Sequence, residues 1–313
     1  MAIVANTYTT YTAIGQREDL SDIIDIISPT DTPVQSALRK SKAKGRFFEW
    51  QTDALAAAAN NAQLEGDDTA FTAITPTVRW GNYCQISSKS FVISATEEIV
   101  DKAGRKSEIA YQTRNKLKEL KRDKEFAILR NTTFNAGNTT TARQTRGFAG
   151  WITQGSVGAG AGAFPIPGSN TAPVAGTLRN LTEALVLSAM QTAYVAGGAP
   201  TMLSVTPAHK TIVSGFSGNN TVLRREDSDS NKLHVSFDFY VTDFGTLKVV
   251  ANRFQDTAAY LIDFDHVELK TLRPVAREQL AKTGDAEKHL VVEEWGLEMS
   301  NKDAHAQIRD LNA

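Results

Sequence analysis

The chain has 313 residues, 41% hydrophobic and 22% charged, which is typical of a globular protein with one or two domains and a sizeable core. Lys and Arg number 34 and Asp and Glu 35, so the net charge of -1 argues against a dedicated nucleic-acid-binding protein. The sequence shows neither an apolar run of about 18 residues nor a signal peptide, so we expect a protein that stays in the cytoplasm and contacts no membrane.

The first forty residues predict an extended arm that contains one short helix. Residues 1–15 carry almost no charge, whereas residues 17–27 place apolar side chains at spacings of three and four, and Pro29 follows. This helix bears four acidic side chains, at Glu18, Asp19, Asp22 and Asp25. We expect the arm to be held in place by a surface outside itself.

A concentrated basic segment follows the arm. Its members are Arg39, Lys40, Lys42, Lys44 and Arg46. One interpretation is an electrostatic contact with the acidic arm helix, either of the same chain or of a neighbouring copy. The alternative is a solvated charged surface, because exposed ion pairs contribute only about 0–1 kcal/mol each.

Residues 45–94 predict a long β-hairpin with a polar tip. Phe48 and Trp50 share one face of the first strand, Trp80 lies on the second strand, and an alanine-rich and Gly-containing stretch separates them. No pattern in either strand offers the hairpin a core of its own, so we expect it to pack on another molecule. An ordinary antiparallel sheet within the domain is the alternative.

The next element is a long, charged helix. Residues 94–97 form a capping box that begins a first helix, and residues 105–130 predict a second helix of about 40 Å. Ala110, Leu117, Leu120 and Ala127 would form a stripe facing a sheet. Lys and Arg on its other sides are interleaved with acids, so a solvated surface is favoured over a phosphate-binding one.

The rest of the chain predicts an α+β unit and returning strands. Residues 155–176 form a Gly-, Ala- and Pro-rich loop, in which Pro165 and Pro167 leave no helix to receive a nucleotide phosphate. The sequence predicts a helix at 178–194, a strand at 202–205 and a helix that begins at residue 207. A polar loop at 214–232 follows, and after it come strands at 235–241, 247–251 and 258–263. Strands at 267–272 and 288–299 then lead to a terminal extension, residues 301–313.

We find no motif that predicts catalysis or a cofactor. Cys84 lies in an apolar strand and predicts a buried structural thiol, and the five histidines have no metal-ligand spacing. Adjacent carboxylates such as Glu293 and Glu294 point apart in a strand, so surface solvation is the better explanation. A hydrolase with a dispersed triad stays an alternative because triads assemble from distant residues.

Several short segments in a defined order resemble one protein family. They are Gly15-Gln16-Arg17-Glu18-Asp19-Leu20, Ser28-Pro29 with Thr32-Pro33, Lys118 to Glu125, Arg146-Gly147-Phe148-Ala149-Gly150-Trp151-Ile152, Tyr240-Val241-Thr242-Asp243-Phe244-Gly245, Lys282-Thr283-Gly284-Asp285-Ala286, and Glu293-Glu294-Trp295-Gly296-Leu297-Glu298 with Asn301. Together they span nearly the full chain. The sequence resembles the major capsid proteins of tailed bacteriophages, with the Hong Kong-ninety-seven-type fold, and most closely a lineage once described as a family of unknown function and typified by a coliphage with a prolate head.

The resemblance implies an α+β coat subunit with an arm (1–40), an extended loop (41–93), a peripheral domain with a spine helix (94–176 and 265–313) and an axial domain (177–264). Such subunits form hexamers and pentamers that enclose double-stranded DNA in a virion assembled in the bacterial cytoplasm. It also implies a portal and a separate scaffolding protein as partners, with room for a decoration protein. The subunit contacts would involve the acidic and basic residues above together with Phe48, Trp50 and Trp80.

Overall fold

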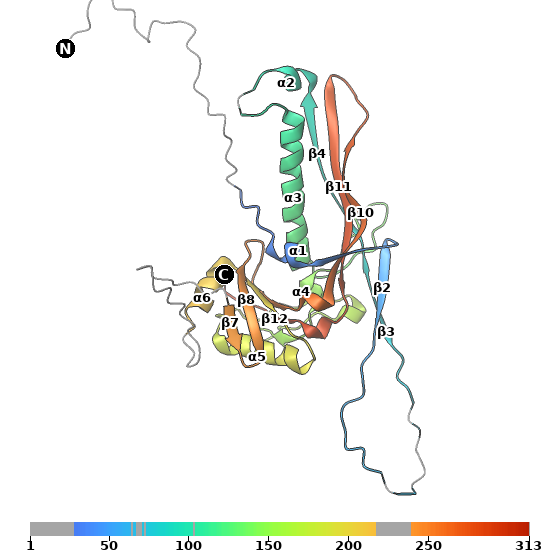
Figure 1. Ribbon diagram of the computed structural model, residues 1–313, viewed down its shortest axis with the longest axis vertical. Coiled ribbons are helices and arrows are strands. Elements are labelled where there is room, and N and C mark those ends of the chain that lie inside the picture. Colours follow the sequence, from blue (N-terminus) through green and yellow to red (C-terminus); the bar gives the residue numbers. More distant parts are fainter. Residues whose placement is uncertain are drawn as a thin grey trace, which may run out of the picture.

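The computed structural model describes residues 28–312 except 64, 67–70, 72, 103 and 217–238. The acidic arm helix with Glu18, Asp19, Asp22 and Asp25, and most of the polar loop at 214–232, lie outside the described residues. The described part is elongated: one end is built by a long helix beside a sheet, and a hairpin projects from the opposite end (Figure 1).

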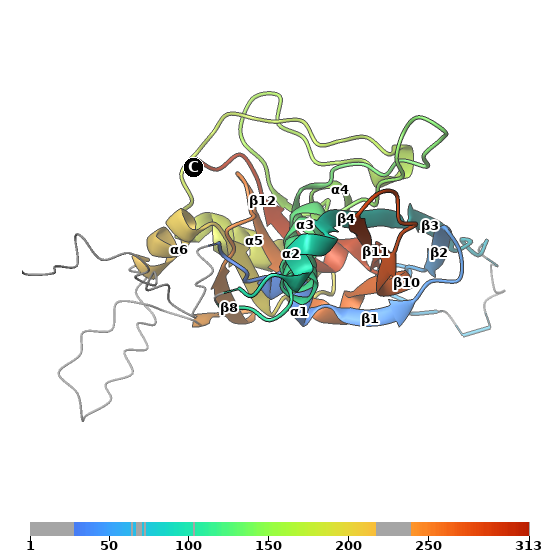
Figure 2. The same ribbon diagram turned by 90° about the horizontal axis from the view of Figure 1, so that it is seen from above.

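A four-stranded sheet forms the part of the molecule that contains the long helix, with the strand order β1-β10-β11-β4. The short edge strand β1 (Arg39–Lys42) is parallel to β10 (Val267–Gln279), whereas β11 (Ala286–Met299) is antiparallel to both β10 and β4 (Gln85–Ser94). The strands β10 and β11 are longer than the sequence predicts. β1 and β4 lie at the two edges of this sheet (Figure 2).

The long helix α3 (Glu108–Arg130) lies along this sheet and confirms the predicted spine. Ser94 accepts a hydrogen bond from the Glu97 N–H at the start of α2 (Ala95–Ile99), as the capping box predicts, and Ser107 caps α3 in the same way. The predicted apolar stripe is only half correct. Ala110 is exposed, while the buried residues of the helix, apart from Glu108, run from Leu120 onward.

A six-stranded sheet forms the second part, in the order β5-β12-β9-β6-β8-β7. Its strands are β5 (Gly155–Ser156), β12 (Ala306–Ile308), β9 (Ala259–Ile262), β6 (Met202–Val205), β8 (Gly245–Ala251) and β7 (Phe239–Thr242). The helix α5 (Glu183–Val195) contacts β5 and β12 of this sheet, and α6 (Pro207–Ser214) contacts β6 and β8. The start of α6 at Pro207 agrees with the sequence, while α5 begins five residues after the predicted residue 178.

The C-terminal residues are a structural strand and not an extension. β12 pairs with β9 on one side and with β5 on the other, and Ala306 and Ile308 are fully buried. The expectation of a terminal extension at 301–313 is therefore wrong. The alternation of apolar residues in a strand of three residues is too short to be read from sequence.

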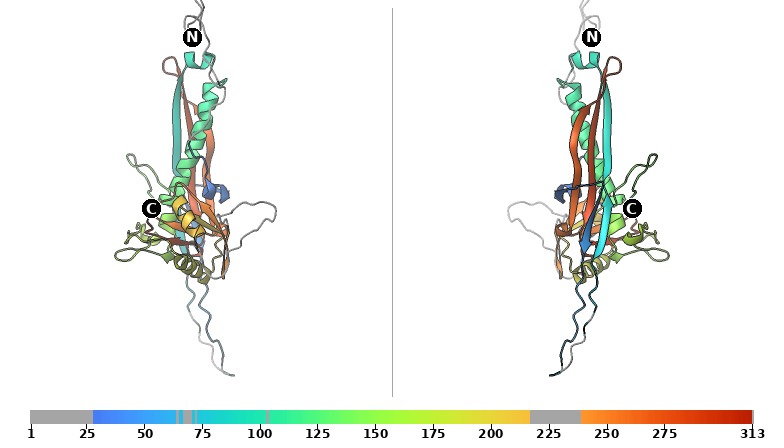
Figure 3. Two further views of the ribbon diagram at one scale, coloured as in Figure 1. Left: turned by 90° about the vertical axis from the view of Figure 1, so that its left-hand side faces the viewer. Right: turned by 90° about the vertical axis from the view of Figure 1, so that its right-hand side faces the viewer.

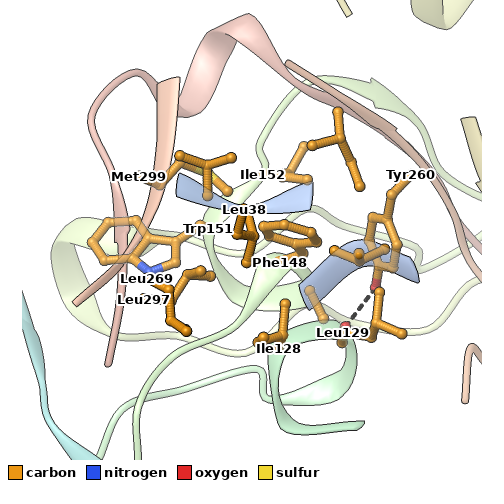
Figure 4. Close-up of a cluster of buried hydrophobic side chains, with 14 of the residues drawn as sticks. Leu38, Ile128, Leu129, Phe148, Trp151, Ile152, Tyr260, Leu269, Leu297 and Met299 are labelled. Carbon is orange, nitrogen blue, oxygen red and sulfur yellow. Dashed lines mark hydrogen bonds between the residues drawn. The ribbon is translucent and has the colours of Figure 1, made fainter. Parts of the chain in front are cut away.

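One of two hydrophobic clusters lies where the two sheets, the end of α3 and the short helix α4 (Phe148–Trp151) meet, and the other lies between α5 and the six-stranded sheet. Phe148, Trp151 and Ile152 are almost wholly inaccessible and contact residues of both parts (Figure 4). In the same cluster the Tyr260 hydroxyl donates to the Leu129 carbonyl at 3.0 Å, at the C-terminal turn of α3. One continuous core thus joins the spine to the strands of the six-stranded sheet.

Two carboxylates predicted to be solvated are in fact buried, Glu293 against the spine helix and Glu294 against the loop that carries Arg143. Glu293 and Glu294 are 4% and 8% exposed; Glu293 pairs with Lys124 of α3, and Glu294 pairs with Arg143. Lys124 itself is only 4% exposed, so this part of the spine surface is not solvated either. Burial of single charges is costly, and the two pairs exist because each acid meets a base.

Candidate functional site

A two-stranded hairpin projects from the body as a separate sheet. β2 (Phe47–Thr52) and β3 (Val78–Tyr83) pair in antiparallel register, with Trp50 opposite Trp80. Beyond Thr52 and Val78 the described residues form no ladder, and the described residues between them extend away from the body (Figure 3). We name β2 and β3 the hairpin root and residues 53–77 the hairpin tip.

The hairpin root has a core within its own subunit, which corrects the sequence interpretation. Phe48 and Trp50 are each 9% exposed, and the Trp50 ring lies 5.2 Å from the ring of Trp151. Trp80 is half-buried, packs edge-on to Trp151 at 6.1 Å, and donates its indole N–H to Thr52 Oγ1 at 3.0 Å. Phe48 and Trp50 therefore have no free surface for a neighbouring copy. The sequence could not reveal this because Trp151 lies 100 residues away.

Asn82 fastens β3 to two other segments, the loop at residues 145–146 and β11. Its side-chain amide donates to Leu297 O at 2.7 Å, to Thr145 Oγ1 at 3.0 Å and to Arg146 O at 3.1 Å. Its oxygen accepts from the Arg146 backbone N–H at 3.0 Å, and the residue is fully buried. A buried, fully bonded amide is costly to disturb, so the direction in which the hairpin leaves the body is well determined.

Arg146 holds a second loop against the same region. Its guanidinium is 1% exposed, donates to the Pro167 carbonyl at 3.0 Å and to the Asn170 side chain at 2.5 Å, and lies over the ring of Trp151 at 4.5 Å. Burial lowers the pKa of Arg146 to about 10. The loop at 155–176, which the sequence describes only as Gly-rich, is thereby pinned next to the hairpin root.

Glu125 joins the start of the described chain to the spine. Its carboxylate is completely buried and accepts from the N–H groups of Val34 at 3.0 Å and Gln35 at 2.7 Å, at the start of α1 (Pro33–Ala37). The Asn252 amide donates to it as well, at 2.6 Å. Burial is the main cause that raises the pKa of Glu125, against these three hydrogen bonds. Sequence reasoning treated Glu125 as part of a solvated face and missed this contact.

The hairpin tip has the opposite character to the root. Leu55, Phe71 and Ile74 are 98%, 96% and 95% exposed. Large apolar side chains that remain this exposed mark a surface that contacts another molecule more often than a surface that stays in water. The expectation that the hairpin packs on another molecule thus applies to its tip, not to its root.

The basic segment lies along the β1 edge of the four-stranded sheet and before β2. Arg39 forms an ion pair with Asp265, whereas Lys40, Lys42, Lys44 and Arg46 are exposed and have no ion pair with any described residue. The proposed contact with the acidic arm stays a prediction, since the arm lies outside the described residues.

The single cysteine and the acidic and histidine side chains of the described residues form no metal site. Cys84 is buried as predicted, and burial raises its pKa to about 11. Among the residues that the structure describes, we find no cluster of His, Cys, Asp and Glu that could hold a metal ion. No described helix is long and apolar enough to cross a membrane.

Comparison with known proteins identifies the family. The sequence profile of the SU10 major capsid protein family matches residues 3–312. The chain belongs to this family. It is similar to the major capsid protein of Escherichia phage Phieco32, with 29% identity over 330 residues that cover 94% of each chain.

Solved capsid structures share the fold of this family member. The capsid asymmetric unit of cyanophage A-1(L) matches with a TM-score of 0.67 and 13% identity, covering 97% of this chain and 99% of that chain. The capsid of a native GTA particle matches with a TM-score of 0.63 and 12% identity, covering 97% of both chains. The expected α+β capsid fold is confirmed. The chain is a phage coat protein, identical copies of it form the shell, and its location is the virion capsid.

Proposed function

We propose that copies of this chain assemble as hexamers and pentamers into a closed icosahedral or prolate head around double-stranded DNA, with the hairpin tip of each copy lying across an adjacent subunit. The observation that carries the proposal is the near-complete exposure of Leu55, Phe71 and Ile74 on a segment that no described part of the same chain covers. Burial of such side chains between copies stabilises an assembly by about 25 cal/mol per Å² of apolar surface.

The domain organisation of the coat fold fits the two sheets with two changes of boundary. We propose that the four-stranded sheet and α3 form the peripheral domain and that the six-stranded sheet forms the axial domain. β5 and β12 then belong to the axial domain, because both are strands of its sheet. β1 and β4, in turn, belong to the peripheral domain and not wholly to the arm and the extended loop.

The partners beyond identical subunits are also part of the proposal. A portal and a separate scaffolding protein would act during assembly in the bacterial cytoplasm, with a decoration protein as a further partner. Packaged DNA would be contacted without sequence specificity, in keeping with a net charge of -1. The role is structural, without catalysis.

A deletion tests the assembly role. Replacing residues 54–76 with a two-residue Asn-Gly turn removes the hairpin tip but keeps Phe48, Trp50 and Trp80 in the core. We expect a folded, soluble subunit with an unfolding transition like that of the full chain, and no shells in negative-stain micrographs. A matched control shortens the exposed turn at residues 138–141, and this variant should still form shells. Normal particles from the tip deletion would contradict the proposal.

The two alternatives predict different solution behaviour. A hydrolase predicts a small discrete oligomer in light scattering under conditions in which we expect shells. A nucleic-acid-binding protein predicts binding of double-stranded DNA by the isolated subunit, with an affinity that falls steeply as salt rises. Shells without such binding would favour the coat role over both.

A further inference from the structure

The hairpin tip is both apolar and acidic. Residues 53–77 contain four carboxylates, at Asp53, Glu65, Asp67 and Asp68, and neither Lys nor Arg. The tip also exposes Leu55, Phe71 and Ile74 almost completely. A surface that complements the tip must therefore combine positive charge with exposed apolar side chains.

One edge of the four-stranded sheet combines these two properties. β1 covers β10 only from Glu268 to Thr271, so from Arg273 onward β10 is the outermost described strand on that side. This uncovered stretch exposes Arg273, Arg277, one acidic residue, Glu278, and, at 44%, Val275. Leu280, just after the strand, is 42% exposed. Together with the exposed part of the basic segment it forms the basic edge, which we define as Lys40, Lys42, Lys44, Arg46, Arg273 and Arg277.

The charges of the basic edge are not neutralised within the described part of the chain. None of its six side chains forms an ion pair with a described residue. The opposite edge strand, β4, differs: its charged residue Lys89 is paired with Asp123 at 2.6 Å. The exposed surface of α3 also mixes its charges, as in the pair between Lys116 and Glu119.

The uncovered stretch of β10 offers backbone groups only in part, because Pro274 has no N–H and the register shifts between Arg273 and Ala276. A strand at the edge of a sheet presents unpaired N–H and C=O groups that can pair with an extended segment of another chain. Residues 53–63 of the hairpin tip have no ladder partner of their own. Charge and apolar side chains thus match between the two surfaces.

We infer that the basic edge of one copy receives the acidic hairpin tip of a second copy. This inference rests on the proposed shell assembly and adds the receiving surface. The tip points away from β1 and β10 of its own chain, so the contact joins two copies (Figures 1 and 3). Two other occupants of the basic edge, the acidic arm at residues 17–25 and packaged DNA, serve as alternative outcomes of the test.

A charge exchange tests the inference. The edge variant carries Arg273→Glu and Arg277→Glu, and the tip variant carries Glu65→Lys and Asp67→Lys. We expect each variant to lower the yield of shells about tenfold, and the chain with all four changes to recover it to within about threefold of the wild type. A matched control, Lys106→Glu just before α3 with Lys121→Glu on the exposed side of α3, should assemble like the wild type.

Cross-linking gives a second readout that does not depend on charge. Shells are assembled from an equal mixture of two chains, one with Phe71→Cys and the other with Val275→Cys, and treated with a short bismaleimide. A cross-linked pair of one chain of each kind is expected on a denaturing gel. Pairing two different chains makes the contact intermolecular, and native Cys84 is buried.

Four results would overturn the inference. These are normal assembly by the edge variant, no recovery in the fourfold variant, recovery when the edge variant instead carries Glu18→Lys and Asp22→Lys in the arm, and loss of salt-dependent DNA binding by the edge variant with shells unaffected. Wild-type protein that forms no shells would contradict the proposed function itself. Wild-type shells with no charge rescue and no cross-link would contradict only the receiving surface.

Discussion

The hairpin root and the hairpin tip belong to one continuous ribbon but have opposite environments. At the root, Trp50 and Trp80 pack against Trp151, and Asn82 is bonded to two other segments. At the tip, Leu55 and Phe71 are almost fully exposed. The contrast teaches that a long β-hairpin can be part of the subunit core at one end and incomplete at the other, so stability and assembly depend on different residues of the same element.

The largest expected effect is the loss of subunit stability when the packing of the hairpin root is removed. Replacement of Trp151 by Ala removes a side chain that is 1% exposed and contacts both Trp50 and Trp80. We expect a loss of about 3–5 kcal/mol in the free energy of unfolding, measured by urea denaturation of the isolated subunit. A loss below about 1 kcal/mol would mean that the root is not part of the core.

A second prediction tests the buried contacts that hold the body beneath the root. Lys124→Ala leaves Glu293 buried without its base, which should cost about 3–5 kcal/mol. The double variant Lys124→Met with Glu293→Leu should recover most of that loss in the same urea experiment. The exposed pair of Lys116 and Glu119 is the control, and Lys116→Ala should change stability by about 0–0.5 kcal/mol.

Acid should weaken the body while leaving the tip unaffected. Burial lowers the pKa of His305 from 6.5 to about 4, and its Nδ1 accepts from the Asp263 N–H at 3.1 Å, which requires the neutral ring. Because the unfolded chain gains this proton near pH 6.5 and the folded chain only near pH 4, stability falls as pH falls through that window, by about 3 kcal/mol in all.

The control for His305 is a variant that keeps a hydrogen-bond acceptor for the Asp263 N–H but has no group at this position that gains a proton between pH 6.5 and pH 4. His305→Asn places an amide oxygen where Nδ1 accepts, and its stability should be flatter between pH 6.5 and pH 4 than that of the wild type. An equal slope for both proteins, followed by urea unfolding at each pH, would assign the acid sensitivity to other groups.

The smallest expected effect on the isolated subunit is at the tip. Phe71→Ala and Leu55→Ala remove side chains without contacts in the subunit, so each should change its unfolding free energy by less than about 0.5 kcal/mol. Both should nevertheless reduce the yield of shells in sedimentation. A tip variant that destabilises the subunit as Trp151→Ala does would erase the contrast between the two regions.

Local patterns were sufficient for much of the fold. The capping box at Ser94, the helix start at Pro207 and the pairing of β2 with β3 were correctly predicted, because each depends on residues close in sequence, whereas residues 85–94 of the predicted hairpin belong to the four-stranded sheet. The resemblance to coat proteins correctly indicated the family and the fold.

Contacts between distant segments account for the errors. Glu293 and Lys124 each seemed to be solvated, and only the packing of α3 on β11 makes them a buried pair. Glu125 clamps α1 from 90 residues away, and β12 is a central strand despite its three residues. Periodicity within one element cannot indicate which other element covers it. The sequence therefore predicts that the hairpin root packs on a neighbouring copy, whereas in the structure it packs on Trp151 of the same chain.

The hydrogen bonds of Asn82 fix the hairpin rigidly to the body at the root and leave the tip free to bend. A sideways load on the free end reaches the sheet through Leu297 and Arg146 without a pivot in between. The part that can bend begins beyond Thr52 and Val78, where the β-ladder ends. Subunits at places of different curvature in a shell would therefore adjust by bending this part while the root keeps its angle.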